Sequence, residues 1–393
     1  MDKRPFNLGD LLRPVRGRAS AIGAFAAAFS VLPAHAGIDP VSGIDFVRIG
    51  ATYGGAGNPA YVDSTPNSFI NGRGGVSYEY HIGRFEVTTS QWVEFFNAAY
   101  DRPANDRIPH LVVPDHWGAA PTTPNTMGGR RWSVPTGNEM IPVGDISWRM
   151  AAIYCNWLHN GKSAARESFL AGAYDVSTFG FESGVPNLRF TDQREHSPGA
   201  RYWIPTWDEW LKAAHYDPNK QNADGSTGGW WEYANGRDRP PVYGPPGSLV
   251  NGQLAEANAG WDDRNFPGQS PFAVPLGSYA NVAQSPWGLL DTAGGTAEWT
   301  ESIFQFPGDS RYRIFDGSFW IEDSGQSVFG DWISSPRSEF PHVPTLEFGL
   351  RLASSVPSPG NALVGTGVLL LWTPRSRRRG TWLGASYTFS RSC

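Results

Sequence analysis

Three long stretches rich in glycine, proline and asparagine limit what this chain can fold into: Gly54 to Gly75, Pro103 to Gly137, and Gly225 to Gly268. These residue types favour turns, so stretches of this length predict large surface loops. The chain is nevertheless 40% hydrophobic and contains 17 tryptophans, most of which we expect in a core. The pattern favours a small strand framework that carries large loops, and it disfavours a helix bundle.

Between Asp45 and Ala353 there is no charge run, low-complexity tract or internal repeat long enough to mark a second domain. We therefore predict a single domain over residues 37–355, with a processing signal on each side of it.

The first 36 residues have the three parts of a secretory signal peptide. A basic stretch ends at Arg18, an apolar run extends from Ala19 to Leu32, and Ala34-His35-Ala36 supplies a small-x-small cleavage site. We expect cleavage before Gly37 and export of the domain. The alternative for these residues is a buried helix at the start of the fold.

The other end of the chain also has three parts. Val356-Pro357-Ser358-Pro359-Gly360 precedes an apolar run from Ala362 to Trp372 and an arginine cluster that ends at Arg379. Residues 356–379 thus resemble the PEP-CTERM-like sorting signal of bacterial surface proteins, although Ser358 replaces the usual glutamate and a tail, residues 380–393, follows. This resemblance implies a location at the cell surface, in the outer envelope or in the extracellular matrix of a bacterium.

The charges of the chain are unevenly distributed. The formal net charge is −5, yet without the first 36 residues and the segment after Val356, 22 basic side chains remain against 35 acidic ones. An acidic domain disfavours nucleic acid and anionic membranes as partners, so we expect membrane contact only through the carboxy-terminal segment. Such a domain leaves room for bound cations.

Local patterns predict several elements of secondary structure. Thr88 with Gln91, and Thr206 with Glu209, are capping boxes that start helices, and Ser147 can cap a third helix through Cys155. Alternating hydrophobicity predicts two strands, Tyr78 to Phe85 and Arg311 to Trp320.

Five segments occur in an order typical of one family. The fourth contains Gly294-Gly295-Thr296-Ala297-Glu298-Trp299, which is similar to the pattern Gly-Asn-x-x-Glu-Trp. In order, the segments are His81 to Trp92; Pro142 to Trp148 with Ala152 to Trp157; Arg201 to Trp210; Trp287 to Trp299; and Asp316 to Trp320 with Arg337 and Phe348 to Ala353. Together they resemble the formylglycine-generating (sulfatase-modifying factor) family. The resemblance implies an α+β, C-type-lectin-like fold with few short helices, small antiparallel sheets and many irregular loops.

The reactive cysteines of that family have no counterpart here. In active members two thiolates beyond the Gly-Gly-Ser-Trp segment bind copper(I), a metal that selects soft sulfur ligands. Here residues Ile321 to Gln326 contain no sulfur, and Ile321 and Gln326 stand near the positions of the pair. Cys155 lies on an apolar helix face, and we predict a buried structural thiol. We therefore expect no copper and no formylglycine-generating activity.

The resemblance also implies calcium sites built from carboxylate and backbone oxygens, a ligand set that suits a hard cation. Glu298 and Gly295 match one site, although Gly295 replaces the family's amide side chain. Asn258 and Ala259 resemble part of another site, which Asp262 or Asp263 would complete. The alternative is that Glu298 hydrogen-bonds backbone amides within a tryptophan-rich core.

Three functions remain open on the sequence. The first is a non-catalytic module that binds a glycan, a peptide or a surface protein in the cleft where the cysteines would lie, with Trp320, Ser318, Arg337 and Trp299 as candidate cleft residues. The second is an oxidoreductase or related enzyme of divergent chemistry, and the third is a structural element of a surface layer. An enzyme requires a pocket lined by polar groups, whereas a binding module requires an open groove rimmed by aromatic rings.

Overall fold

The structure is a computed structural model that describes residues 37–51, 57–65, 68–122, 131–183, 189–261, 264–305, 311–321, 328–335 and 337–355. The predicted signal peptide, sorting signal and tail lie outside these ranges, as do Asp262, Asp263 and Gln326. Within the described ranges, no helix combines the length and apolarity that a membrane span requires.

The three predicted helix starts are confirmed. Helix α1 (Thr89–Ala99) begins with a complete capping box between Thr88 and Gln91, and α4 (Trp207–His215) begins with a second one. The hydroxyl of Ser147 caps α2 (Trp148–His159) by accepting from the amide of Met150. The sequence patterns did not predict the short helix α3 (Glu167–Leu170) or the 3-10 turns Ala104–Asp106, Val176–Thr178 and Pro271–Ala273.

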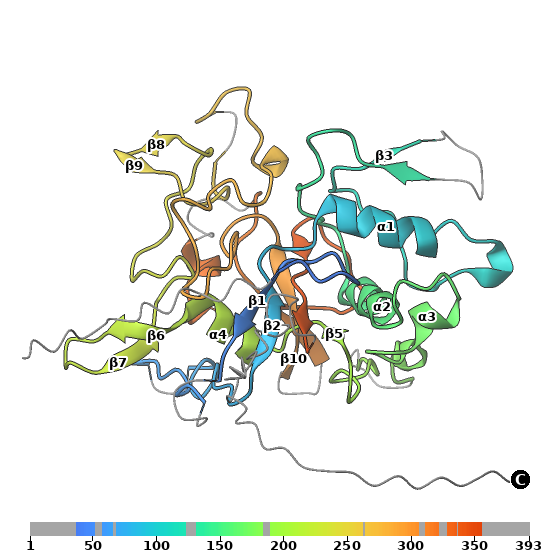
Figure 1. The fold of residues 1–393 in the computed structure, drawn as a ribbon, viewed down its shortest axis with the longest axis horizontal. Coiled ribbons are helices and arrows are strands. Elements are labelled where there is room, and N and C mark those ends of the chain that lie inside the picture. The colour runs from blue at the N-terminus through green and yellow to red at the C-terminus, as the bar shows by residue number, and fades with distance from the viewer. Residues whose placement is uncertain are drawn as a thin grey trace, which may run out of the picture. The chain divides into compact units, whose positions relative to one another are not determined.

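Two four-stranded sheets form the framework (Figure 1). The first has the order β1 (Phe46–Ile49), β2 (Tyr80–Gly83), β14 (Ala353–Ser354) and β5 (Tyr202–Trp203), with antiparallel pairs, so the start and the end of the domain meet in one sheet. The second has the order β12 (Arg337–Glu339), β11 (Arg311–Asp316), β10 (Ala297–Gln305) and β13 (Phe348–Gly349), in which β13 runs parallel to β10.

Short two-stranded ribbons account for most other strand structure in the described residues. They are β3 (Ala120–Pro121) with β4 (Trp132–Ser133), β6 (Tyr216–Gln221) with β7 (Thr227–Trp230), and β8 (Leu249–Val250) with β9 (Gln253–Leu254). The first and third ribbons lie in stretches that the sequence assigns to loops. The result is the predicted α+β class, with small sheets, few helices and extensive irregular backbone.

Both predicted strands are shorter in the structure than in the sequence interpretation. Tyr78 to Phe85 is a strand only over β2, and Arg311 to Trp320 is a strand only over β11. The second strand ends because Gly317 has a φ of 81°, a left-handed conformation that turns the chain and favours glycine. The chain therefore changes direction after Gly317, and the residues that follow do not continue the strand.

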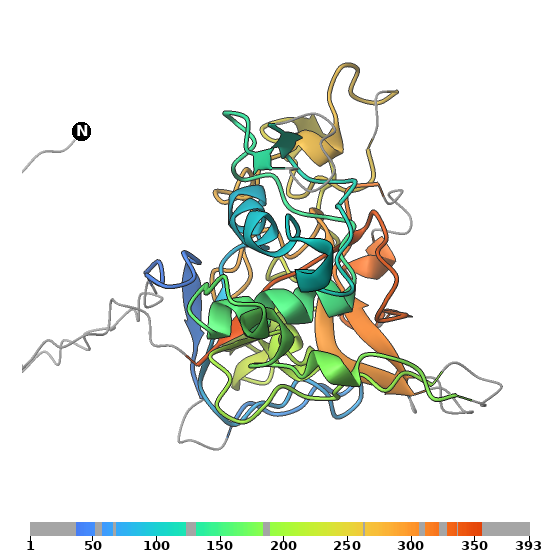
Figure 2. The same cartoon turned by 90° about the vertical axis from the view of Figure 1, so that its right-hand side faces the viewer.

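Aromatic side chains dominate the core, as the composition predicts. Ten tryptophans of the described residues are buried, and Trp92 packs against Phe95 and Tyr154 with ring centroids 4.9 and 5.2 Å apart. These contacts join α1 to α2, which lie in the same part of the ribbon in Figures 1 and 2. Cys155 is completely buried, and burial raises the pKa of its thiol well above the ordinary value. This confirms the prediction of a buried thiol.

Candidate functional site

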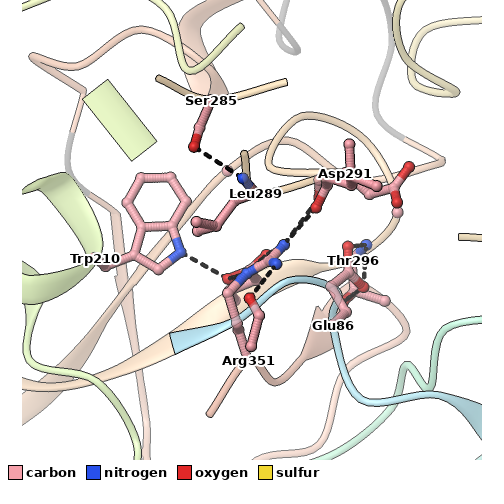
Figure 3. A network of polar contacts seen from close by, with 12 residues as sticks. Glu86, Trp210, Ser285, Leu289, Asp291, Thr296 and Arg351 are labelled. Atoms are coloured by element: carbon pink, nitrogen blue, oxygen red, sulfur yellow. Dashed lines mark hydrogen bonds and ion pairs between the residues drawn. The ribbon is translucent and has the colours of Figure 1, made fainter. Parts of the chain in front are cut away.

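A buried ion pair between Glu298 and Arg351 lies at the centre of the candidate site. Figure 3 shows Arg351 with its neighbour Trp210. Glu298 belongs to β10 and Arg351 to the link between β13 and β14, and their side chains are 1% and 0% exposed. Arg351 Nη2 lies 2.6 Å from Glu298 Oε1, and Arg351 Nε lies 3.0 and 2.9 Å from the two carboxylate oxygens. Trp210 Nε1 donates to Glu298 Oε2 at 2.6 Å. The carboxylate is thus surrounded by donors.

The same guanidinium group connects segments that are far apart in sequence. Arg351 Nη1 donates to the carbonyls of Gly83 and Arg84 at 2.9 and 2.7 Å, and Nη2 donates to the carbonyl of Leu290 at 2.9 Å. Although burial opposes it, the charge of Glu298 raises the pKa of Arg351 above its ordinary value. One charged group therefore holds the end of β2, the loop at Leu290 and β10 together.

Glu86 is a second buried carboxylate next to this pair, as Figure 3 shows. It accepts from the amide of Thr296 at 3.2 Å and from the Thr296 hydroxyl at 2.5 Å. Burial, followed by the nearby charge of Glu298, raises the pKa of Glu86 well above its ordinary value. A Cβ at Gly295 would lie 2.1 Å from Glu86 Oε1, so this carboxylate occupies the space that any side chain at Gly295 would need.

Asn258 joins three loops beside these carboxylates. Its Oδ1 accepts from the amide of Gly295 at 2.6 Å, and its Nδ2 donates to the carbonyl of Pro271 at 2.9 Å. A Cβ on Gly294 would lie 2.2 Å from Asn258 Oδ1, which explains the second glycine of the pair. The Gly294 amide donates to Ser318 Oγ at 2.8 Å, and this bond extends the network to the turn after β11.

Two buried aspartates fix that turn. Asp316 accepts from Trp207 Nε1 at 2.7 Å and from the Gly317 amide at 2.9 Å. Asp331 accepts from the Ser318 amide at 2.9 Å and from the Tyr243 hydroxyl at 2.7 Å. Burial raises the pKa of Asp316 to about 7 and that of Asp331 to about 6.

Beyond the turn the chain reaches an open groove of about 570 Å³. The lining residues are mainly aromatic, aliphatic or small: Trp261, Gly268, Gln269, Ser270, Pro271, Trp320 and Ile321. Trp320 stacks on His116 with ring centroids 5.2 Å apart and also contacts Phe272 at 5.3 Å. In the part of the chain that the structure describes, the buried indole N–H groups of Trp261 and Trp320 have no acceptor. We call this cavity the tryptophan groove.

Of the four predicted cleft residues, only one lines the tryptophan groove. Trp320 lines the tryptophan groove, whereas Trp299 is completely buried, donates to the Ile146 carbonyl at 2.8 Å and packs on Phe348. Ser318 is also completely buried, and both its hydroxyl and its amide form hydrogen bonds that stabilise the turn. The guanidinium of Arg337 lies over Phe315 and donates to the Gly317 carbonyl. Ser318 and Arg337 support the turn, Trp299 packs in the core, and none of the three lines the groove.

Comparisons with known proteins identify the family. The model of the "Sulfatase-modifying factor enzyme 1-like domain" matches residues 69–356, more than half of the chain. The chain belongs to the sulfatase-modifying factor family. The comparison with curated proteins found no match.

Solved structures that resemble this family member include CarF, with 19% identity, a TM-score of 0.45, and coverage of 80% of this chain and 98% of CarF. Variable protein 1 of Treponema denticola has 18% identity and a TM-score of 0.45, with coverage of 80% and 97%. PvdO of Pseudomonas aeruginosa has 14% identity and a TM-score of 0.42, with coverage of 83% and 99%. The family's C-type-lectin-like fold agrees with the small sheets and long loops of this chain.

Several of the calcium ligands expected from the family already have protein partners. Both oxygens of Glu298 accept from Arg351, and Asn258 Oδ1 accepts from the Gly295 amide, while Ala259 is completely buried. Within the described ranges, no group of three or more histidine, cysteine or acidic residues is arranged to hold a metal ion. Calcium binding stays a prediction.

Sequence reasoning missed two groups in this family site. Glu86 lies in the His81 to Trp92 segment, whose pattern directs attention to the start of a helix and not to a buried acid. Asp331 belongs to no recognised segment, and its partner Tyr243 is 88 residues away in sequence. The glycine pair Gly294-Gly295 was a usable signal for Glu86, since adjacent glycines often mark a close approach.

We predict that Glu298→Gln lowers the free energy of unfolding by about 3–5 kcal/mol, because it leaves the buried charge of Arg351 without a counter-charge. The control is Glu79→Gln in the exposed pair with Arg48, where we expect a loss of less than about 1 kcal/mol. Urea unfolding of both variants measures these values. Equal effects of the two substitutions would contradict this role for the buried pair. If Glu298→Gln does not fold, the double variant with Arg351→Met should recover part of the stability.

A second prediction concerns Asp331, whose raised pKa makes the folded state less stable as the pH rises from about 4 through about 6. Asp331→Asn can keep both hydrogen bonds, because the Tyr243 hydroxyl can accept from the new amide. We expect the variant to gain on the order of 1–2 kcal/mol relative to the wild type between about pH 5 and about pH 7.5. Urea unfolding across this range, with the exposed Asp115→Asn as control, makes the measurement. A constant difference between wild type and Asp331→Asn would show that Asp331 does not titrate as described.

Proposed function

We propose that this member of the family is an exported, non-catalytic binding module that holds a glycan or a peptide in the tryptophan groove. The observation that carries the proposal is the lining of the groove, where two tryptophans flank small and apolar residues. Aromatic rings provide a large contact area at low cost in conformational entropy, which suits recognition.

Polar side chains of the groove support the same function. Gln269 and Ser270 are exposed and line the groove beside Trp261 and Trp320. Carbonyl or hydroxyl oxygens of a ligand would hydrogen-bond these two side chains while its apolar parts contact the rings. Polysaccharides and extended peptides both have this combination of groups.

The absence of sulfur at the family's reactive positions supports a non-catalytic role. The groove is lined by Ile321, which is 52% exposed, near the position of the first family cysteine. Gln326, near the second position, lies outside the described residues. Ile321 can contribute apolar contact, but it cannot bind copper(I).

The location of the module rests on the two ends of the sequence. A signal peptide over residues 1–36 would export the domain, and the sorting signal over residues 356–379 would attach it to the cell surface, the outer envelope or the matrix. An exported module of this kind would meet glycans, peptides and surface proteins.

An enzyme of divergent chemistry is the second candidate. It would require a group that can transfer a proton or bind a metal, and the described lining of the groove offers only Gln269 and Ser270 as polar side chains. A structural element of a surface layer is the third candidate, and it requires no ligand in the groove.

We expect purified protein to bind members of a glycan or peptide array, and Trp320→Ala to weaken the binding at least tenfold, because central aromatic residues carry about 2 kcal/mol or more in interfaces. Trp320→Phe keeps an aromatic ring of smaller area, so it tests whether the contact area of the ring carries the binding. Leu249→Ala changes an exposed residue on β8 and serves as control. No binding to either array, or equal binding by Trp320→Ala, would contradict the proposal.

A further inference from the structure

A second cavity, of about 690 Å³, has a different chemical character from the tryptophan groove. Its lining is polar and charged and includes Arg73, Tyr78, Arg194, His196, Asp208 and Glu301. The two cavities share no lining residue. We call this cavity the histidine pocket. Ligand binding in it would be independent of the function proposed for the tryptophan groove.

His196 is fixed in place on two sides. Its ring stacks on Trp203 with centroids 4.6 Å apart and an interplanar angle of 18°. Its Nδ1 lies 3.2 and 3.1 Å from the two oxygens of Glu301, whose side chain is only 2% exposed. A carboxylate only accepts hydrogen bonds, so Nδ1 carries a proton. Nε2 has no hydrogen bond within the described ranges, and it is therefore the ring atom available to a ligand.

Glu301 accepts two further hydrogen bonds. The hydroxyl of Tyr174 donates to Glu301 Oε1 at 2.8 Å, and the His196 amide donates to the same oxygen. Burial lowers the pKa of His196, but the hydrogen bond and the charge of Glu301 outweigh it, so the pKa is raised overall. Glu209 and Glu195 act in the same direction. The imidazole is thus held in its cationic form up to a higher pH than usual.

Arg73 provides a second donor in the pocket. Its Nη2 pairs with Asp208 Oδ2 at 3.1 Å, and its guanidinium lies over the Trp207 ring at 5.1 Å. The Arg73 side chain is 34% exposed and lines the pocket, so part of its guanidinium group can reach a ligand. Asp208 is further occupied by the Gly74 amide at 2.6 Å. Two of the three acids that line the pocket are thus engaged by protein donors, and only the exposed Glu195 is left without a described partner for its carboxylate.

Uncharged groups complete the lining. Tyr78 presents a half-exposed ring and donates its hydroxyl to Glu209 at 2.9 Å. Ser302 Oγ accepts from the Trp207 amide at 3.0 Å, which leaves its hydroxyl hydrogen available. Thr206 also lines the pocket. Hydroxyl groups beside an aromatic face suit a ligand that has several hydroxyl groups of its own.

We propose that the histidine pocket binds the carboxylate of a hydroxyl-rich ligand of the size of a sugar acid, with His196 Nε2 and the guanidinium group of Arg73 as the donors. The carboxylate accepts from both groups, and hydrogen bonds between charged partners are stronger than neutral ones. Arg194, which also lines the pocket, adds positive charge. The ligand is either a free sugar acid or a uronate unit of a polysaccharide.

The test is calorimetric titration of the full-length protein with glucuronate, an oligouronate and, as the neutral match, glucose. At about pH 5.5 we expect one of the two acids to bind at least tenfold more tightly than glucose, and we expect the binding to weaken towards about pH 8 as His196 loses its proton. Binding of the monomer assigns a free acid, and binding of the oligomer alone assigns a polymer. Failure of both acids to bind, or equal binding of glucose, would overturn the proposal.

Variants locate the binding on these residues. His196→Asn keeps a donor to Glu301 but removes Nε2, and Arg73→Lys keeps the charge near Asp208 but removes the planar guanidinium donors. Each should weaken acid binding on the order of tenfold or more. Leu249→Ala, which changes an exposed residue outside the pocket lining, and Trp320→Ala should leave acid binding intact. Unchanged affinity of His196→Asn would overturn the assignment, and the result for Trp320→Ala separates this site from the tryptophan groove.

Discussion

The ion pair between Glu298 and Arg351 is the interaction on which the rest of the site depends. Both side chains are removed from water, so neither could keep its charge there without the other. The remaining donors of Arg351 are also used, on carbonyls of β2 and of the loop at Leu290. This buried charge gives β2, β10 and the loop at Leu290 a common fixed point.

The residues that stabilise the site and the residues that line the tryptophan groove are different. Asn258, Ser318 and the two buried aspartates are engaged by protein partners and have little capacity left for a ligand. The tryptophan groove is built from residues that follow these supports in sequence. A scaffold of this kind can keep its geometry while the residues that face the ligand change. Function can therefore change on a family framework that stays the same.

Local features of the fold could be predicted from the sequence, whereas long-range contacts could not. The capping boxes at Thr88 and Thr206 involve neighbours three residues apart, so their patterns are visible in the sequence. The end of β11 depends on the backbone conformation of Gly317, which residue types alone do not specify.

The site was harder to predict for the same reason. Motif membership identified Trp320, Trp299 and Ser318 together, but burial separates them, and only Trp320 lines the groove. The His196 to Glu301 contact joins residues 105 positions apart, and neither belongs to a family segment. Contacts of this kind follow from the packing of the sheets and loops, which no local pattern records.

We propose that this chain keeps the scaffold of the family but not its oxidation chemistry. The most direct measurement is mass spectrometry of a cysteine-containing sulfatase peptide after incubation with the purified protein, copper and oxygen. We expect an unmodified cysteine, because residues 321–326 supply no thiolate to bind copper(I). Formylglycine above the background of a reaction without protein would contradict it.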